Sequence, residues 1–208
     1  MESGIVTYIL IAITGLVSFL SFSNVALLNK CIFYPYLMKD KSQWYRFISH
    51  GFIHGDMTHL LFNMLTLYFF GKNVEVIFFY LFGNIYIYPL FYLSALVFSS
   101  LPSYSKNKNN PHYSALGASG AVSAILFTTI LFDPWQTILL KFIIPIPAIL
   151  FAIGYVYYSH TMSKRGTDNI GHDAHLYGAL FGIIFPVVFK PGLISIFIEQ
   201  LSHPRFLN

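Results

Sequence analysis

Apolar stretches long enough to cross a lipid bilayer recur along most of this chain of 208 residues. A spanning helix needs about 20 mostly apolar residues, and residues 4–28 form the first such run. Only 10% of the residues are charged, whereas about a quarter are charged in soluble domains. A soluble enzyme is therefore excluded, as is a disordered chain, because 19% of the residues are aromatic. We expect an all-α, polytopic membrane protein.

The apolar runs predict six spanning helices separated by polar breaks. The segment 71–75 (GKNVE) favours a helix end and a tight turn, whereas Pro145 and Pro147 predict a kink within a helix. Residues 29–56 mix aromatic and basic side chains, which is typical of a membrane-interfacial loop; an ordinary solvated loop is the alternative. The expected helices span about 4–28, 57–72, 76–101, 116–132, 136–159 and 171–189. No repeat or second domain is visible, so we expect one domain over 1–208.

Charge and cysteine content exclude further classes of protein. The net charge is +4, but the twelve Lys and Arg residues are scattered and form no basic stripe for a nucleic acid. Cys31 is the one cysteine, which excludes an intramolecular disulfide and a cysteine-based metal cage. The lack of a soluble domain or a transit-like leader favours a bacterial cytoplasmic membrane.

Polar residues at membrane depth are costly and are usually functional, and three clusters of them stand out here. In the first, His59 and Asn63 are four residues apart and share one helix face. Two donors on one face suit a developing oxyanion. The alternative is an interhelical hydrogen bond that only ties two helices together.

The second cluster, Gly117-Ala118-Ser119-Gly120, opens a predicted helix. Helix N-termini carry unpaired N–H groups and a partial positive charge, which suit a nucleophile whose tetrahedral intermediate is negative. Gly117 and Gly120 allow another backbone or a substrate to approach closely. Packing of helices through small residues is the alternative.

The third cluster places His175, Gly178 and Gly182 on one helix face. The two glycines form a GxxxG face, which allows a neighbouring helix very close and would bring His175 to Ser119. A neutral imidazole there could take the serine proton as general base. His172 and Asp173 lie one turn nearer the interface, and we expect no catalytic role for them.

Two rival chemistries use the same residue types. Five histidines could converge on a metal ion: His50, His54, His59, His172 and His175. However, no H-E-x-x-H motif stands in the sequence and no carboxylate falls on the His59 face, so we expect no metal. An aspartyl dyad needs two buried Asp residues, whereas Asp133 and Asp173 lie at predicted helix ends.

Together the three clusters resemble the rhomboid family of intramembrane serine proteases. The matching motifs are His59-x-x-x-Asn63, Gly117-Ala118-Ser119-Gly120, Ala174-His175-x-x-Gly178-x-x-x-Gly182, Arg46-x-x-x-His50-x-x-x-His54 and Gly71-x-x-x-Glu75. The resemblance implies six helices around a water-filled cavity and a first loop that lies partly in the bilayer. It also implies a substrate gate formed by the fifth helix and the segment that follows it.

The resemblance further implies that Ser119 is the nucleophile and His175 the base, in a dyad with no essential acid. His59, Asn63 and the Ser119 backbone N–H would form the oxyanion hole, with Gly117, Gly120, Gly178 and Gly182 in support. Substrates would be membrane-spanning helices, and no cofactor is used. The alternatives are a non-catalytic rhomboid-like protein that binds and regulates membrane helices, and a small transporter.

Two features depart from the family pattern, and the charge distribution conflicts with the family orientation, which we nevertheless expect. Tyr45 separates Trp44 from Arg46, where the family often has Trp-Arg. Ser123 stands one turn after the nucleophile, where an aromatic residue often packs on the base, so Tyr177 or another aromatic must hold His175. The family layout places both termini inside, whereas the basic residues are more numerous in the outward loops, against the positive-inside rule.

Overall fold

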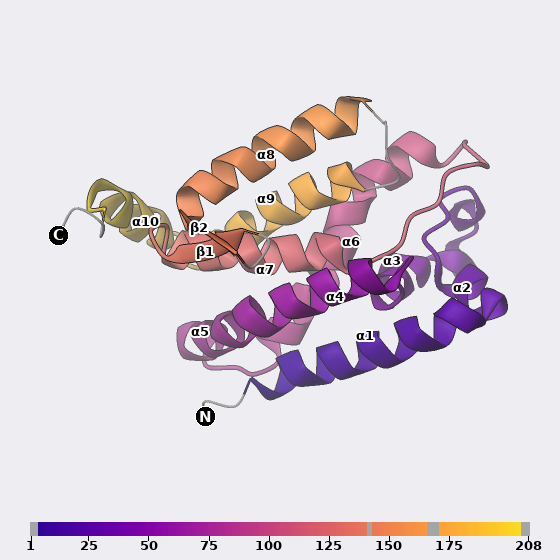
Figure 1. The fold of residues 1–208 in the computed structure, drawn as a ribbon, viewed down its shortest axis with the longest axis horizontal. Helices are drawn as coiled ribbons and strands as arrows, with labels where there is room; N and C mark the ends of the chain where they lie inside the picture. The colour runs from indigo at the N-terminus through magenta and orange to yellow at the C-terminus, as the bar shows by residue number, and fades with distance from the viewer. Residues whose placement is uncertain (1–3, 141–142, 166–170, 205–208) are drawn as a thin grey trace.

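The computed structural model describes residues 4–140, 143–165 and 171–204. Its helices and strands, in chain order, are α1 (Ile5–Ser23), α2 (Val25–Cys31), α3 (Arg46–Ser49), α4 (Met57–Thr66), a π-helical segment (Leu67–Gly71), α5 (Lys72–Phe82), α6 (Ile87–Asn107), α7 (Ser119–Phe132), β1 (Thr137–Leu140), β2 (Ile144–Pro147), α8 (Ala148–Arg165), α9 (His172–Phe189) and α10 (Leu193–Ser202). Three 3-10 turns (Leu37–Lys39, Lys41–Gln43 and His50–Phe52) complete the loop before α4. In Figure 1, α1 and α8 lie at opposite edges of the bundle, with α4, α7 and α9 between them.

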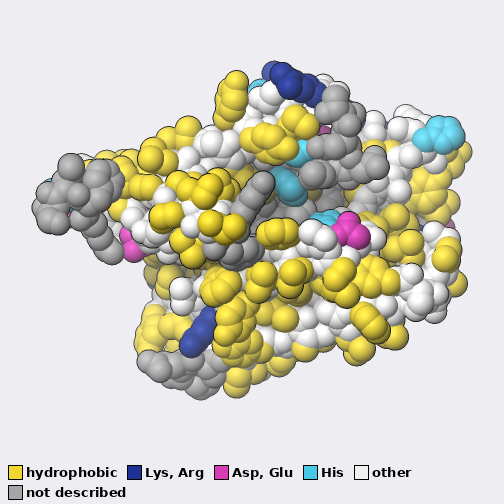
Figure 2. Space-filling view, in the orientation of Figure 1, with side chains coloured by type: hydrophobic (Ala, Val, Ile, Leu, Met, Phe, Trp, Pro, Cys, Tyr) yellow, Lys and Arg dark blue, Asp and Glu magenta, His cyan; other side chains and the backbone are white. Residues whose placement is uncertain are grey.

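The first helix is polar on the inside and apolar on the outside. Its buried residues recur every three or four positions: Thr7, Leu10, Thr14, Ser18 and Ser21. Its exposed residues include Ile5, Ile9, Ile13, Leu16 and Phe19. Figure 2 shows hydrophobic side chains over much of the visible face and few charged ones. Small residues inside and large apolar ones outside are the pattern of helices that face lipid.

Three helical stretches are long and apolar enough to cross a membrane: α1, the continuous stretch Met57–Phe82, and α9. Helices α6, α7 and α8 are not both long enough and apolar enough to be counted as spans. Helix α7, for example, has only 14 residues. The part of the chain that the structure describes therefore contains three candidate spans, where the sequence predicts six.

The predicted break after residue 72 is wrong. The chain continues as a helix from α4 through Leu67–Gly71 into α5, and the turn comes at Gly83, which has a left-handed φ of 66°. The charge at Glu75 is tolerated inside the helix because its carboxylate accepts hydrogen bonds from the start of α1. The donors are the backbone N–H groups of Val6 (3.1 Å) and Thr7 (2.8 Å) and the Thr7 hydroxyl (2.8 Å). The next helix, predicted over 76–101, is accordingly shifted to Ile87–Asn107.

The predicted helix over 136–159 is also wrong in its first half. Two antiparallel strands, β1 and β2, form a hairpin there, so the described residues are mostly but not entirely helical. Pro145 and Pro147 lie in β2, opposite Leu139 and Thr137, and they do not kink a helix. Proline lacks the N–H that a helix interior requires, and it is tolerated in an edge strand. The helix begins only after them, at Ala148.

The central helix is α7, in which every residue from Gly120 to Leu131 is buried. Helix α9 packs along it very closely, as the sequence predicts for a GxxxG face. A Cβ atom on Gly178 would lie 2.9 Å from the carbonyl carbon of Gly120, and one on Gly182 would lie 2.8 Å from that of Ala124. Gly178 meets Gly120, and four residues further along each helix Gly182 meets Ala124. Helices α7 and α9 therefore run parallel. Their N-terminal ends therefore lie together.

Candidate active site at the start of α7 and α9

Ser119 is the first residue of α7 and is partly exposed. It follows Gly117, whose φ of 116° is open mainly to glycine. The first N–H groups of a helix have no intrahelical acceptor, so donors are available around the Ser119 hydroxyl. A small cavity adjoins this hydroxyl and is lined by Ser99, Ser100 and His50. The predicted nucleophile thus has backbone donors beside it and lines a small cavity of mixed polar and apolar character.

His175 lies in the first turn of α9. It is across from Ser119 at the line of close contact where Gly178 and Gly182 of α9 meet the backbone of α7, which we call the glycine seam. The carbonyl oxygen of Ala174 is 3.5 Å from the position of a Cβ on Gly120. Ser119 directly precedes Gly120 in the sequence, and His175 directly follows Ala174. The structure therefore brings the two predicted residues to the same end of the seam.

An aromatic ring from α8 packs on His175. The Tyr155 ring stacks on the imidazole with 5.9 Å between ring centroids and 27° between planes. Its hydroxyl lies 2.5 Å from the Ser123 hydroxyl of α7. Tyr177, the residue suggested from sequence, is only two positions from His175 and faces another direction on the helix. Sequence reasoning missed Tyr155 because the contact comes from a different helix.

The second histidine of α9 also belongs to this neighbourhood. The His172 ring is buried and meets the His175 ring edge-on, with 5.8 Å between centroids. Next to it, the Asp173 carboxylate accepts a hydrogen bond from the Ser163 hydroxyl of α8. Its other oxygen, Oδ2, lies 3.8 Å from the Lys106 ammonium nitrogen of α6. Among the described residues, histidine, cysteine and carboxylate side chains form no group of three that could hold a metal ion.

His59 and Asn63 approach the site from α4. A Cβ on Gly117 would lie only 2.6 Å from the His59 ring, so the imidazole packs directly over the turn before Ser119. The Asn63 side chain is buried and donates one amide hydrogen to the His59 carbonyl at 2.9 Å. Its second amide hydrogen is a further donor. Asp56 caps α4 by accepting from the His59 backbone N–H at 2.8 Å.

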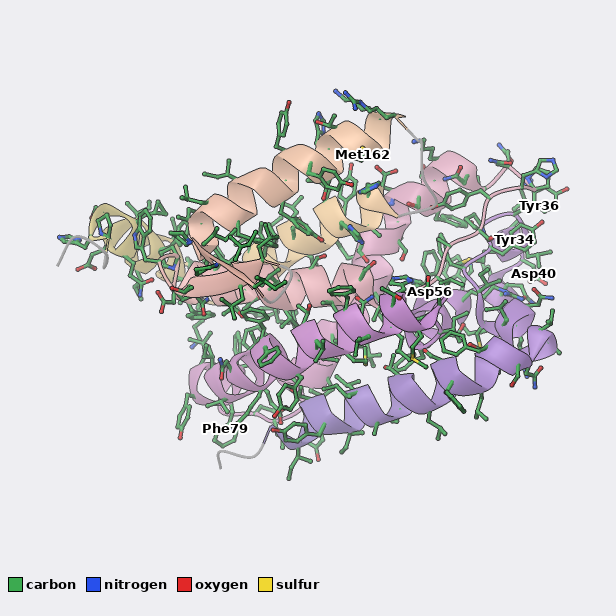
Figure 3. All side chains as sticks on the ribbon, viewed as in Figure 1. Tyr34, Tyr36, Asp40, Asp56, Phe79 and Met162 are labelled. Atoms are coloured by element: carbon green, nitrogen blue, oxygen red, sulfur yellow. The ribbon has the colours of Figure 1, made fainter. Side chains whose placement is uncertain are left out.

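The starts of three helices lie close together at the candidate site. Figure 3 labels Asp56 at the start of α4 and Met162 near the end of α8, and in this view the starts of α7 and α9 lie between them. Figure 2 shows histidine side chains gathering in the same region of the surface. Polar groups that α4, α7 and α9 contribute are thus collected at one end of the bundle.

His54, in the loop before α4, holds the backbone in front of Ser119. One ring nitrogen, Nε2, accepts a hydrogen bond from the Ala118 N–H at 3.3 Å, and Nδ1 lies 2.9 Å from the Ser18 hydroxyl. Burial lowers the pKa of His54 from 6.5 to about 3, and the nearby His59 adds to this effect. The ring is therefore neutral at pH 7, as an acceptor nitrogen requires.

His50 fixes the same turn from an earlier position in the loop. Its carbonyl accepts from the Gly117 N–H at 2.9 Å, and its ring lies 2.8 Å from the Arg46 carbonyl and 3.2 Å from the Ser100 hydroxyl. Burial lowers the pKa of His50 to about 4. The two loop histidines thus hold the residues that lead into α7.

Arg46 anchors this loop to the end of α2. Its buried guanidinium donates to the carbonyls of Asn29 (2.8 Å) and Ile32 (2.7 Å). Despite the altered order Trp44-Tyr45-Arg46, both aromatic residues also donate to backbone carbonyls: the Trp44 indole to Met38 (3.2 Å) and the Tyr45 hydroxyl to Lys30 (3.1 Å).

A helical bundle with an apolar exterior, and with polar groups collected at the start of its central helix, is the architecture of a membrane protein. A match to the Rhomboid domain covers residues 41–191. The chain therefore belongs to the rhomboid family, as its motifs indicate.

Three curated relatives are similar over most of this chain. RHOMBOID-like protein 12, mitochondrial, of Arabidopsis thaliana is 32% identical over 149 residues, which are 66% of this chain and 44% of the relative. Rhomboid-like protein 11, chloroplastic, from the same plant is 30% identical over 162 residues (72% and 54%). Rhomboid-related protein 1 of Caenorhabditis elegans is 27% identical over 169 residues (78% and 45%). The chain thus spans about half the length of these relatives. Two of them carry organelle names, so the expected bacterial membrane gains no support.

Proposed function

We propose that this protein is a serine endopeptidase that cleaves transmembrane segments of other membrane proteins. The observation that supports this most directly is the backbone contact of Gly120 with Ala174 and Gly178. This contact sets the start of α9 against the start of α7. Ser119 follows the turn at Gly117 there, and His175 lies on the same face of α9 as Gly178. A protein that only binds helices requires neither group.

In the proposed reaction His175 takes the proton of the Ser119 hydroxyl, and the resulting alkoxide attacks the scissile carbonyl carbon. The Ser119 N–H, Asn63 and His59 stabilise the oxyanion of the tetrahedral intermediate. His175 then returns the proton to the leaving amine. Water from the hydroxyl-lined cavity hydrolyses the acyl-enzyme, and His175 again acts as base. The reaction uses no metal ion or cofactor.

The length of α7 supports substrates that lie in the membrane. Its 14 residues span about 21 Å at about 1.5 Å per residue, whereas the hydrocarbon core of a bilayer is about 30 Å thick. If its far end meets one membrane surface, Ser119 lies about 10 Å below the other. In this arrangement the chain forms one domain in which α1, Met57–Phe82, α6, α7, α8 and α9 are the six spans, and the loop before α4 is embedded.

The decisive experiment uses the purified full chain in lipid vesicles with a single-pass reporter substrate. We expect Ser119→Ala to abolish cleavage and labelling by a fluorophosphonate probe while the thermal unfolding temperature stays the same. Ser105→Ala, at an exposed serine of α6, is the matched control and should retain both. Cleavage by the Ser119→Ala variant would refute the nucleophile. Stable binding of the reporter by the natural chain without cleavage or labelling would favour a helix-binding protein instead.

A further inference from the structure

Tyr155 belongs to α8, the helix at the edge of the bundle, but its side chain reaches the candidate site. Its ring stacks on His175 of α9, and its hydroxyl lies 2.5 Å from the Ser123 hydroxyl of α7. One side chain of α8 therefore contacts both helices that carry the proposed dyad. The neighbouring Leu150, Ile153 and Tyr157 of α8 are exposed and face away from the bundle.

Ser123 provides a fixed anchor for this ring. It lies one helical turn after Ser119 and is 3% exposed, so its hydroxyl needs a partner within the protein. The Tyr155 hydroxyl supplies that partner. The hydrogen bond holds the ring at a defined height along α7, level with the imidazole on the adjacent helix.

We propose that Tyr155 is the positioning residue for His175 and that Ser123 holds Tyr155 in place; this inference rests on the proposed function. The outer torsion of a histidine side chain has a broad energy minimum, so the rings packed against it set the plane of the imidazole. Here the packing ring comes from α8. Alignment of the base with Ser119 then depends on α8 staying docked against α9.

Ordinary core packing is the competing explanation. Tyr155 also lies against Phe151 and Phe127, with ring centroids 5.5 Å and 5.6 Å away. Loss of a ring that only fills space would lower stability but would leave the folded protein with the same turnover number. The two explanations therefore differ in measurements made on folded protein.

The first test compares single variants on the reporter substrate. Misplacing a catalytic group by about 1 Å costs up to about 100-fold in rate, so we expect Tyr155→Leu to lower kcat about ten- to a hundredfold with little change in KM. Tyr155→Phe keeps the ring and should lose far less. Tyr157→Leu, at a residue of the same helix that is 74% exposed, is the matched control and should behave like the natural chain.

The second test moves the ring to the other helix. Tyr155→Ser should lose activity as Tyr155→Leu does, and adding Ser123→Tyr should recover much of the loss, because the new ring enters the space vacated next to residue 123. Ser123→Ala and Tyr155→Phe each remove the same hydrogen bond. Their effects on kcat should therefore not add in the double variant.

The third test does not depend on activity. With ¹³C-labelled histidine, the His175 ring resonance is assigned by its loss in His175→Ala. The stacked tyrosine shifts this resonance by its ring current, so Tyr155→Leu should move it, while Tyr155→Phe and Tyr157→Leu should not. An unmoved resonance would show that Tyr155 does not stack on His175, and a folded Tyr155→Leu protein with the natural kcat would show that the stacking does not position the base; either result overturns the proposal. If the resonance moves but Ser119→Ala still cleaves, the contact of Tyr155 with His175 stands and the assignment of Ser119 as the nucleophile fails.

Discussion

Gly178 of α9 packs directly against the peptide backbone of Gly120 of α7, with its Cβ position 2.9 Å from the carbonyl carbon. No side-chain rotation can relieve such a contact, because the obstacle is main chain. An alanine at residue 178 therefore has to push the two helices apart. This seam is also what holds the proposed nucleophile and base at one end of the bundle.

We expect Gly178→Ala to lower both stability and activity. Overpacking of a tight interior typically costs about 1–3 kcal/mol, and the separation should also reduce probe labelling of Ser119. Thermal unfolding in detergent and the rate of fluorophosphonate labelling measure the two effects. Gly154→Ala is the control, because a Cβ at that glycine of α8 meets nothing within 4 Å. Equal behaviour of the two variants would contradict the role of the seam.

Asn63→Ala should reduce turnover without unfolding the protein. Removing one oxyanion donor costs about 100- to 1,000-fold in kcat, and the truncated side chain leaves the α4 backbone intact. Asn73→Ala, at an exposed asparagine of the same continuous helix, should leave kcat unchanged. Steady-state kinetics on the reporter substrate compare them. A loss confined to KM would show that Asn63 binds substrate and does not stabilise the oxyanion.

Stability should fall as the pH is lowered below about 6.5. The unfolded chain protonates His50 and His54 near their ordinary pKa of 6.5, whereas burial keeps the pKa of His50 at about 4 and that of His54 at about 3 in the folded protein. Between these values the unfolded state binds more protons, so acid favours unfolding, by up to about 1.4 kcal/mol per pH unit for each histidine. Unfolding temperatures recorded from pH 7 to pH 4 measure the slope.

The matched variants for this pH dependence are His54→Gln and His112→Gln. The first should show a shallower slope, because glutamine keeps polar groups at the site and does not titrate. The second changes an exposed histidine of the α6–α7 loop and should keep the natural slope. The same slope in all three proteins would show that His54 does not set the acid sensitivity.

Glu75→Gln should weaken the attachment of α1. The buried carboxylate accepts three hydrogen bonds from Val6 and Thr7, and hydrogen bonds to charged groups contribute about 1.5–3 kcal/mol each. Glutamine has one acceptor oxygen in place of two, so we expect a loss of about 1–3 kcal/mol. Denaturant unfolding in micelles measures it, with the exposed Glu199→Gln as control. An unchanged midpoint would show that these hydrogen bonds add nothing to the net stability.

Residues with a local chemical signature can be placed from sequence, whereas those held by distant contacts cannot. Ser119 is expected at the start of a helix, and α7 begins there because Gly117 and its left-handed φ end the preceding loop. The glycine spacing of α9 likewise predicts a face open to close packing. Tyr155 has no such signal, since its contacts with Ser123 and His175 lie on two other helices.

The wrong helix boundaries have the same origin. Around Glu75, a local reading of charge and glycine predicts a turn, but the N–H groups of α1 provide partners for the carboxylate and the helix continues. Around Pro145, apolar composition predicts a spanning helix, but β1 pairs with the proline-containing strand. In both places a partner far away in the sequence, or across a hairpin, decides the backbone conformation.

The π-helical segment Leu67–Gly71 sets the phase between the two halves of the longest helical stretch. Upstream of it, His59 meets the turn at Gly117, and downstream Glu75 meets Thr7 of α1. Deleting one residue from this segment to restore regular α-helix would rotate one half relative to the other by about 100°. Either the contact of His59 with Gly117 or the contact of Glu75 with Thr7 would then be lost. The π-helical segment therefore allows one continuous helix to contribute to the proposed oxyanion hole and also to hold α1 in place.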